Sequence, residues 1–426
     1  MKTTTDVLVI GGGLAGLTAA ATASAQGARA LVLEAHRPGG RSRVSERDGF
    51  TFNHGGHALY VAGEGMAVLR RLGVRPKGSP PPLGAYQLLA GGSLHRMPVG
   101  PGSLLRTTAL SVRSKAAVGK LLVRVPKLDA ADFAGISVDG WIADQDLRDD
   151  AVAVLRALVR IGTYSSALDE LSAGAALQQL QRSIEGGVLY LDGGWAQLVD
   201  GLRSQVELRP NVAVESITDA GNDGVQVRTT GDDLVTARSV VLAAGSPEAC
   251  ASLLGADPDS LWPGLGAPVT ASCLDVGVRG VPSPGYVLGV DEPVYGTVQS
   301  PPAKQAPEGD SVVAVIRYGA RSAAEDRPQL EGWLDHVGVH RETIVCERFL
   351  ARMIVVGAAP RAITGGLTGR PSITSTGMPN VLLAGDWVGR EGMLADASFA
   401  SGQAAGRAAA ADAAAPTSAA SATMGS

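Results

Sequence analysis

Three glycines near the N-terminus have the spacing of a phosphate-binding turn. Gly11, Gly13 and Gly16 fit the pattern G-x-G-x-x-G, and they lie between an apolar run at residues 7–10 and an Ala-rich segment at residues 14–25. In such a turn the first glycine permits a tight bend, the second lets backbone amides approach a pyrophosphate, and the third lets the following helix pack closely on the strand. The pattern predicts a buried strand, a turn and a helix whose N-terminus faces phosphate groups.

An acidic residue follows at the distance that this kind of unit requires. Glu34 ends a second apolar run, residues 30–33, where a carboxylate can accept hydrogen bonds from ribose hydroxyls. The order strand, turn, helix and strand predicts a Rossmann-type unit that binds an adenine dinucleotide. We assign further cofactor contacts to Leu14 and Ala15 at the start of the helix, and to Ala35 after the acid.

The residues after Glu34 indicate which dinucleotide is bound. Residues 34–42 read EAHRPGGRS and resemble the E-x(several)-G-G-R-x-[ST] segment of the FAD-dependent amine oxidase superfamily, which includes monoamine oxidases, protoporphyrinogen oxidases and phytoene-desaturase-like enzymes. The resemblance implies FAD as the cofactor, with Gly40 close to the flavin. Arg41 can donate to phosphate or ring oxygens; the alternative is a surface salt bridge. No cysteine follows Cys346, so we expect the FAD to be bound non-covalently.

Four later segments resemble the same superfamily in the same order. They are residues 53–57 (NHGGH), 192–198 (DGGWAQL), 208–217 and 380–398. The resemblance implies that the first runs along the flavin ring and that the third is a strand meeting the adenine. It also implies that the last carries an aspartate near the ribityl chain or phosphates, and a helix whose amides face flavin N1 and O2. The residues assigned to FAD here are Gly55, Gly56, Val214, Gly385, Asp386, Leu394, Ala395 and Ala397. Asp396 either contacts the cofactor or caps that helix.

Candidate catalytic and substrate-binding residues lie beside these segments. His57 is our first choice for a group near flavin N5 that accepts a proton near neutral pH; the alternative is a histidine that only hydrogen-bonds the backbone or the flavin. Tyr190 and Trp195 are assigned to the substrate pocket, and Trp195 is alternatively a core residue. We expect the flavin to take a hydride from a C–N or C–C bond of a medium-sized, largely apolar molecule. The alternatives are a non-redox isomerase or mutase, and a protein that keeps FAD for structure only.

Composition narrows the range of partners. The 426 residues include 37 Lys+Arg and 41 Asp+Glu, and only 4% are aromatic, so no nucleic-acid partner is expected. No second glycine motif is evident, which favours O2 or another acceptor, such as a quinone, over NAD(P)H. The cysteines are too far apart for a metal cluster or a disulfide framework, and no signal peptide is evident, so we expect no metal and a cytoplasmic location. Nothing indicates the oligomeric state.

The order of these segments predicts an α/β fold in which a Rossmann-type FAD-binding domain is interleaved with a mixed α+β substrate domain. Residues 104–127 of the substrate domain carry basic residues and no acid. They predict either weak contact with a membrane surface or a helix with a solvated basic face. We assign the FAD-binding domain to residues 1–60, 186–254 and 370–412, the substrate domain to 61–185 and 255–369, and a disordered tail to 413–426.

Overall fold

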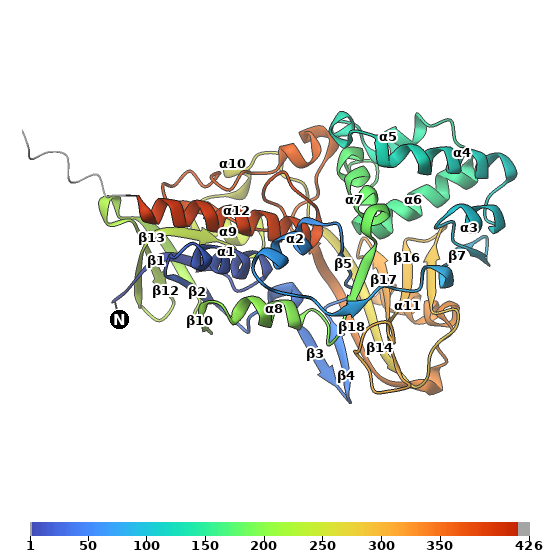
Figure 1. Ribbon diagram of the computed structural model, residues 1–426, viewed down its shortest axis with the longest axis horizontal. Helices are drawn as coiled ribbons and strands as arrows, with labels where there is room; N and C mark the ends of the chain where they lie inside the picture. Colours follow the sequence, from blue (N-terminus) through green and yellow to red (C-terminus); the bar gives the residue numbers. More distant parts are fainter. Residues whose placement is uncertain (1, 416–426) are drawn as a thin grey trace, which may run out of the picture.

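The computed structural model describes residues 2–415 and has two halves, each organised around its own seven-stranded sheet (Figure 1). In the first half the strand order is β10-β2-β1-β13-β12-β11, with β19 beside β13. The strands β10, β2, β1, β13 and β19 are mutually parallel, whereas β12 and β11 are added in antiparallel fashion. The bounds are β1 (Lys2–Ile10), β2 (Ala30–Glu34), β10 (Glu207–Pro210), β11 (Val214–Asp219), β12 (Val225–Thr229), β13 (Leu234–Leu242) and β19 (Val381–Leu383).

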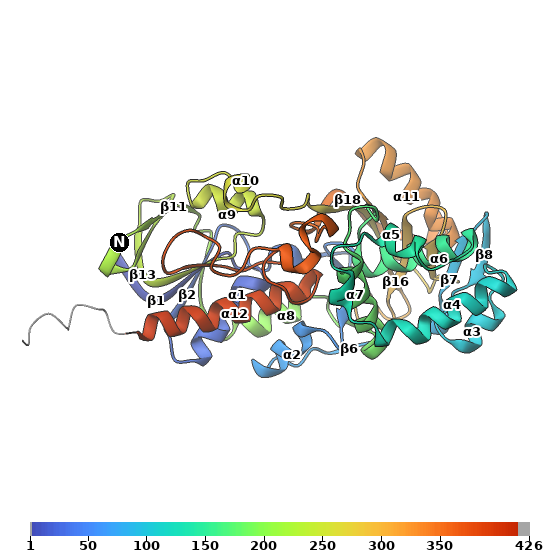
Figure 2. The same ribbon diagram turned by 90° about the horizontal axis from the view of Figure 1, so that it is seen from above.

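This sheet is buried on both faces, as is usual for a parallel sheet between helices. Val7, Leu8 and Val9 in the central strand are each 0% exposed. Helices cover the sheet from both sides (Figure 2). One side carries α1 (Leu14–Ala25), α8 (Ala196–Arg203) and α12 (Leu394–Ala414), and the other carries α9 (Pro247–Leu253) and α10 (Pro258–Leu261).

Helices α1 and α12 cross in close contact because glycines lie at the crossing. A Cβ atom on Gly402 would lie 2.4 Å from the carbonyl oxygen of Ala15, and one on Gly406 would lie 2.3 Å from that of Ala19. Any larger residue at these positions would push the two helices apart. The contact brings the N-termini of both helices to the wall of one cavity.

The second half packs a sheet of order β18-β14-β17-β16-β15-β7-β8 against helices. Its neighbouring strands are antiparallel except for the parallel pair β15 and β7. The strands are β7 (Gln87–Ala90), β8 (Ser93–Arg96), β14 (Val269–Val278), β15 (Tyr286–Gly289), β16 (Val294–Ser300), β17 (Ser311–Tyr318) and β18 (Ile344–Val356). The helices are α3 (Pro101–Arg106), α4 (Val112–Arg124), α5 (Val138–Ala143), α6 (Asp149–Thr163), α7 (Ala173–Gly186) and α11 (Ala323–Val337).

Small elements connect the two halves. Strands β5 (Leu59–Tyr60), β9 (Val188–Leu191) and β6 (Gly78–Ser79) form a three-stranded sheet, β3 (Val44–Arg47) pairs with β4 (Phe50–Asn53), and α2 (Glu64–Arg71) follows β5. The three-stranded sheet joins segments that the sequence assigned to different domains. The domain limits given above therefore stay a proposal.

The structure confirms the fold class and the first strand–turn–helix–strand unit, and it corrects two expectations. Residues 208–217 do not form one strand: β10 ends at Pro210, which lacks an amide for further pairing, and Asn211 has a φ of 59°. The chain therefore bends before β11. The end of α12 was also misplaced, because Ala413 and Ala414 belong to it rather than to a disordered tail. Residues 416–426 lie outside the described residues.

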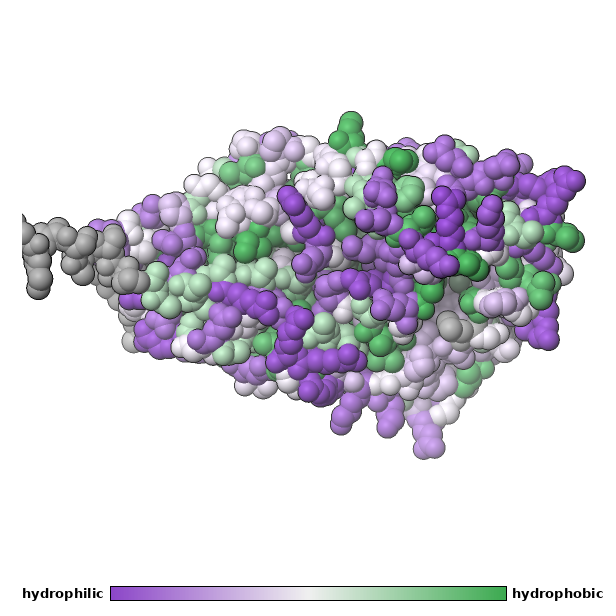
Figure 3. Space-filling model, turned by 45° about the horizontal axis from the view of Figure 1, so that its top comes forward, coloured by the Kyte–Doolittle hydropathy of each residue, from purple (hydrophilic) through white to green (hydrophobic). Residues whose placement is uncertain are grey.

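The basic segment 104–127 is divided between the end of α3, helix α4 and a short 3-10 turn. Three apolar side chains within it point outward: Leu105, Val112 and Val123 are 74%, 84% and 66% exposed. Elsewhere, hydrophilic and hydrophobic side chains intermingle on the face shown in Figure 3. Weak membrane contact by this segment stays a prediction. No helix within residues 2–415 is long and apolar enough to cross a bilayer.

Candidate active site

One cavity of about 1520 Å³ extends between the two halves. Its wall includes Gly13 and Glu34 from the first half, Tyr86 and Tyr295 from the second, and His57 between them. The volume exceeds the range of roughly 300–1,000 Å³ that is usual for one small-molecule site. The cavity therefore has room for a cofactor and a second molecule in continuous space.

The glycine turn at one end of the cavity fits a dinucleotide, and each glycine contributes differently. Gly11 has a φ of 109°, and a Cβ atom there would lie 2.2 Å from the carbonyl oxygen of Ala243. A Cβ atom on Gly16 would lie 1.9 Å from the carbonyl oxygen of Gly11, so Gly16 serves helix packing and does not line the cavity. A Cβ atom on Gly13 would meet no protein atom within 4 Å, because Gly13 faces the open cavity as the N-cap of α1. The space above Gly13 is where a pyrophosphate would lie against the helix N-terminus.

Glu34 lies in the cavity wall at the end of β2. One carboxylate oxygen accepts a hydrogen bond of 2.6 Å from the amide of Gly12, and the other accepts one of 2.8 Å from the amide of His36. Each oxygen keeps a further lone pair that a ribose hydroxyl can use. The acid therefore also fixes the glycine turn, a role that sequence spacing did not reveal. Leu14, Ala15 and Ala35 line the same part of the cavity.

Arg41 and Asp386 form a two-pronged ion pair, although 345 positions separate them. The guanidinium nitrogens lie 2.7 and 2.8 Å from the two carboxylate oxygens, and the amide of Gly357 donates to Asp386 over 3.0 Å. The Asp386 side chain is only 3% exposed, so this is no surface salt bridge. Both residues line the cavity, and 40% of the Arg41 side chain remains accessible to a ligand. Their contacts with FAD stay a prediction.

The remaining residues assigned to FAD divide into two groups. Those that line the cavity are Gly40, Gly56, Val214, Gly385, Leu394 and Ala395. Gly55 and Ala397 do not, and their assignment to FAD stays a prediction. A Cβ atom on Gly55 would lie 2.7 Å from the sulfur of Met353, so this glycine serves packing. The amide of Ala397 lies 3.4 Å from the carbonyl oxygen of Met393, the N-cap of α12.

Asp396 caps a helix, but a different helix from the one expected. It lies in the first turn of α12, whose N-cap is Met393, and its Oδ1 accepts a 2.8 Å hydrogen bond from the amide of Gly65 at the start of α2. Its Oδ2 is buried and has no partner among the described residues. Burial raises the pKa of Asp396 from 3.8 to about 7, with the nearby Glu64 adding to the rise and Arg182 opposing it.

The titration of Asp396 should make the stability of the protein depend on pH. Between about pH 4 and pH 7 the folded state holds a proton that the unfolded state has lost, so the free energy of unfolding should fall as the pH rises through this window. The loss amounts to roughly 4 kcal/mol at most, at ~1.4 kcal/mol per pKa unit. Asp396→Asn keeps an oxygen for Gly65 and should flatten the profile. Urea unfolding of both proteins at pH 5 and pH 8 tests this, and parallel profiles would exclude Asp396 as the titrating group.

His57 lies in the cavity wall beside Trp195. Its Nδ1 lies 2.9 Å from the carbonyl oxygen of Gly55, and its ring meets the Trp195 ring edge-on with 4.9 Å between centroids. Burial lowers the pKa of His57, so the ring is neutral at pH 7 and can accept a proton. Trp195 is 3% exposed and lines the cavity, so it is both a core residue and a wall residue.

The other end of the cavity is apolar and rich in tyrosine. Tyr190, as expected, lines it. Sequence reasoning missed Tyr86 and Tyr295, which lie just before β7 and on β16 and meet Tyr190 only in the folded chain. No motif marks them, and because β16 is buried at every position, no alternation along that strand could have shown which side chains face the cavity. Apolar wall residues in this part include Val118, Leu121, Leu122, Val154, Leu155, Leu158 and Ile161.

Comparison with known proteins identifies the family of this chain. The model of the family described as flavin containing amine oxidoreductase matches residues 14–265, which is more than half of the chain. The chain belongs to this family. As a flavin-containing amine oxidoreductase it is an FAD-dependent enzyme that acts on a small molecule and passes electrons to an acceptor.

The individual proteins that this chain resembles carry the names of different activities. Coproporphyrinogen III oxidase of Propionibacterium freudenreichii subsp. freudenreichii is 27% identical over 421 residues, covering 79% of this chain and 78% of that protein. Prolycopene isomerase of Daucus carota is 48% identical over 56 residues, 13% of this chain and 9% of that protein. Among solved structures, a putrescine oxidase variant (16% identity, TM-score 0.72, 96% and 100% coverage) shares the fold. Cyclohexylamine oxidase of Brevibacterium oxydans also shares the fold, with 18% identity, a TM-score of 0.72, and coverage of 96% of this chain and 99% of that chain.

Proposed function

We propose that this enzyme takes a hydride from a C–N or C–C bond of a medium-sized, largely apolar small molecule. The observation that carries the proposal is the single cavity, which joins the glycine turn to an apolar chamber past His57 and Trp195. Bound non-covalently along the first half, FAD would supply the hydride acceptor at flavin N5. We also propose that O2 or another acceptor, such as a quinone, receives the electrons.

The residues of the chain have separate tasks in this proposal. Apolar side chains from α4 and α6 exclude water from the chamber. His57, neutral because of its burial, can accept a proton from the substrate at Nε2 while Nδ1 stays with Gly55. Trp195 holds the imidazole through the edge-on ring contact. The N-terminus of α12 presents its positive dipole end to the cavity, where it would stabilise the negative charge of a reduced flavin.

Anaerobic reduction of the holoenzyme tests the proposal. The panel should contain an aliphatic amine, a porphyrinogen and a polyene, and loss of the yellow flavin absorbance with one equivalent of product per flavin would support oxidation. We expect His57→Ala to slow this reduction on the order of 10²- to 10⁴-fold, as for loss of a general base, with FAD content unchanged. His95→Ala is the control, because His95 bonds Thr108 outside the cavity. An unaltered rate in His57→Ala would leave His57 a structural residue.

Isomerisation without net oxidation is the second candidate function. The short match to prolycopene isomerase favours it, although that match spans only 13% of the chain. The same anaerobic experiment separates the two functions. Many turnovers of a polyene without loss of the yellow absorbance would establish isomerisation and contradict hydride removal. If the enzyme turns over no member of the panel, the result would favour a protein that keeps FAD for structure only.

A further inference from the structure

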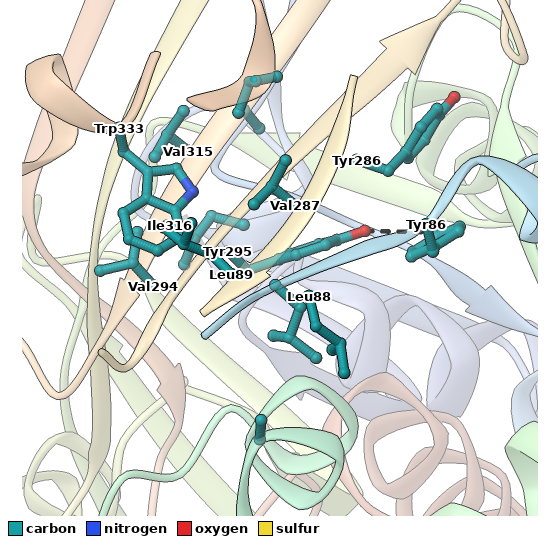
Figure 4. Packing of buried hydrophobic residues seen from close by; sticks show 14 of the residues in the cluster. Tyr86, Leu88, Leu89, Tyr286, Val287, Val294, Tyr295, Val315, Ile316 and Trp333 are labelled. Carbon is teal, nitrogen blue, oxygen red and sulfur yellow. Dashed lines mark hydrogen bonds between the residues drawn. The ribbon is translucent and has the colours of Figure 1, made fainter. Parts of the chain in front are cut away.

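Four hydroxyl groups meet in the wall of the apolar chamber. The hydroxyl of Tyr190 lies 2.9 Å from that of Thr297 and 3.4 Å from those of Tyr86 and Tyr295, which are themselves 3.4 Å apart. Figure 4 shows the hydroxyl of Tyr295 directed toward Tyr86 among apolar neighbours. We call these four residues the hydroxyl cluster. It is assembled from β9, β16 and the residue before β7, so it exists only in the folded chain.

The hydrogen bonds inside the cluster leave capacity for a ligand. Each hydroxyl can donate one hydrogen bond and accept two, and three of the four contacts are at 3.4 Å, well beyond the usual length of about 2.7–2.8 Å for O–H···O. A buried hydroxyl that makes such a long hydrogen bond is stabilised when a ligand oxygen offers it a shorter one. Gln299 on the same strand, β16, adds a second polar group: it is 3% exposed, it lines the cavity, and its Oε1 has no partner among the described residues.

The strands that carry the cluster offer no charged side chain to a ligand. Among the described residues, the acids that line the cavity are Glu34, Asp386 and Asp396, held respectively by the amide of Gly12, by Arg41 and by the amide of Gly65. None of the three lies on β9, on β16 or next to Tyr86, the places that carry the cluster. Burial raises the pKa values of Tyr86 and Tyr295, so these phenols stay neutral donors. An ammonium or carboxylate group here would lack a countercharge in a desolvated space, which costs several kcal/mol.

We propose that the hydroxyl cluster and Gln299 bind one alcohol hydroxyl, which accepts from the cluster and donates to Gln299 Oε1, at the end of an otherwise apolar substrate. The apolar body of that substrate then lies along the chamber toward His57. The inference deepens the proposed function by naming the substrate class, a neutral mono-oxygenated lipid-like molecule rather than an amine or a polycarboxylate. Binding of the substrate oxygen by the hydroxyl cluster does not depend on whether the enzyme then removes a hydride.

Matched ten-carbon probes test the inference without turnover. Decan-1-ol, decylamine and decanoate are titrated into the holoenzyme at pH 7.5 by calorimetry, below the solubility limit of the alcohol and below the micellar concentrations of the two ions. We expect decan-1-ol to bind at least ~10-fold more tightly than either ion, because the ions lose solvation without a partner. Equal or tighter binding of decylamine or decanoate would overturn the inference.

Single hydroxyl deletions locate the binding group. Tyr190→Phe keeps the ring and removes the central hydroxyl, and it should weaken decan-1-ol binding about 5- to 10-fold. Tyr286→Phe is the control, because the Tyr286 ring packs 5.0 Å from that of Tyr86 but does not line the cavity. Thr297→Val serves as a second deletion if Tyr190→Phe loses FAD or unfolds. Wild-type affinity in the deletion tested would overturn the inference. If the protein binds decan-1-ol selectively but no compound of the anaerobic panel reduces its flavin, the inference holds and only the proposed hydride transfer is contradicted.

Discussion

Gly13→Val should weaken FAD binding strongly while leaving the fold intact. Gly13 has a φ of −79°, which valine adopts without strain, and a Cβ atom there meets no protein atom within 4 Å. The new side chain would instead occupy the space that faces the N-terminus of α1. Loss of two amide–phosphate hydrogen bonds, each about 1.5–3 kcal/mol, corresponds to a fall in affinity on the order of 10²- to 10⁴-fold. The measurement is FAD titration of the apoprotein, followed by flavin fluorescence.

A second glycine supplies the matched control for this prediction. Gly332 on α11 also has no atom within 4 Å of its Cβ position, and it is exposed and far from the cavity wall. Gly332→Val should keep wild-type affinity and a similar unfolding midpoint. Wild-type FAD affinity in Gly13→Val would show that the pyrophosphate does not lie over this turn. A loss of fold in Gly13→Val, but not in Gly332→Val, would contradict the open space above Gly13.

Arg41→Ala should lower the free energy of unfolding by about 3 kcal/mol. Among residues 2–415, the substitution leaves the buried carboxylate of Asp386 with the amide of Gly357 as its one hydrogen-bond donor. Breaking a buried pair from one side usually costs ~3–5 kcal/mol. We expect the lower end, because the charge of Arg370 also acts on Asp386. Urea unfolding of the FAD-free protein measures the effect without a contribution from ligand binding.

An exposed ion pair provides the comparison for Arg41. Arg228 and Asp232 lie 3.9 Å apart with side chains 53% and 91% exposed, so Arg228→Ala should change the free energy of unfolding by less than about 1 kcal/mol. Removing both partners, in Arg41→Met with Asp386→Leu, should restore much of the stability lost in Arg41→Ala. Equal effects of Arg41→Ala and Arg228→Ala would mean that the Asp386 carboxylate is hydrated rather than buried.

The family and the cavity together restrict the chemistry more than either does alone. Membership of the flavin-containing amine oxidoreductases establishes FAD and an oxidoreductase, yet its name suggests an amine. The strands that carry Tyr190 and Thr297 offer the cavity hydroxyls and apolar side chains, and none of their residues is charged. We therefore propose that substrate preference in this enzyme depends on groups that lie outside the shared cofactor-binding motifs.

Local features of the chain were predictable from the sequence because short-range sterics determine them. The strand–turn–helix–strand unit depends on the spacing of three glycines and on apolar runs at residues 7–10 and 30–33, all within one short segment. Pro210 and Asn211 carried an equally local signal, a missing amide and a tolerance of positive φ, that should have ended the strand predicted for residues 208–217.

Contacts between distant segments were decided only by the tertiary structure. The pairing of Arg41 with Asp386, the capping of α2 by Asp396, and the convergence of Tyr86 and Tyr295 on Tyr190 each join parts of the chain that no short motif relates. The sequence by itself predicted where FAD would bind, because backbone conformation at a few glycines shapes the open turn at residues 11–16. It left open what else enters the cavity, because side chains meet there only after two separate sheets have packed together.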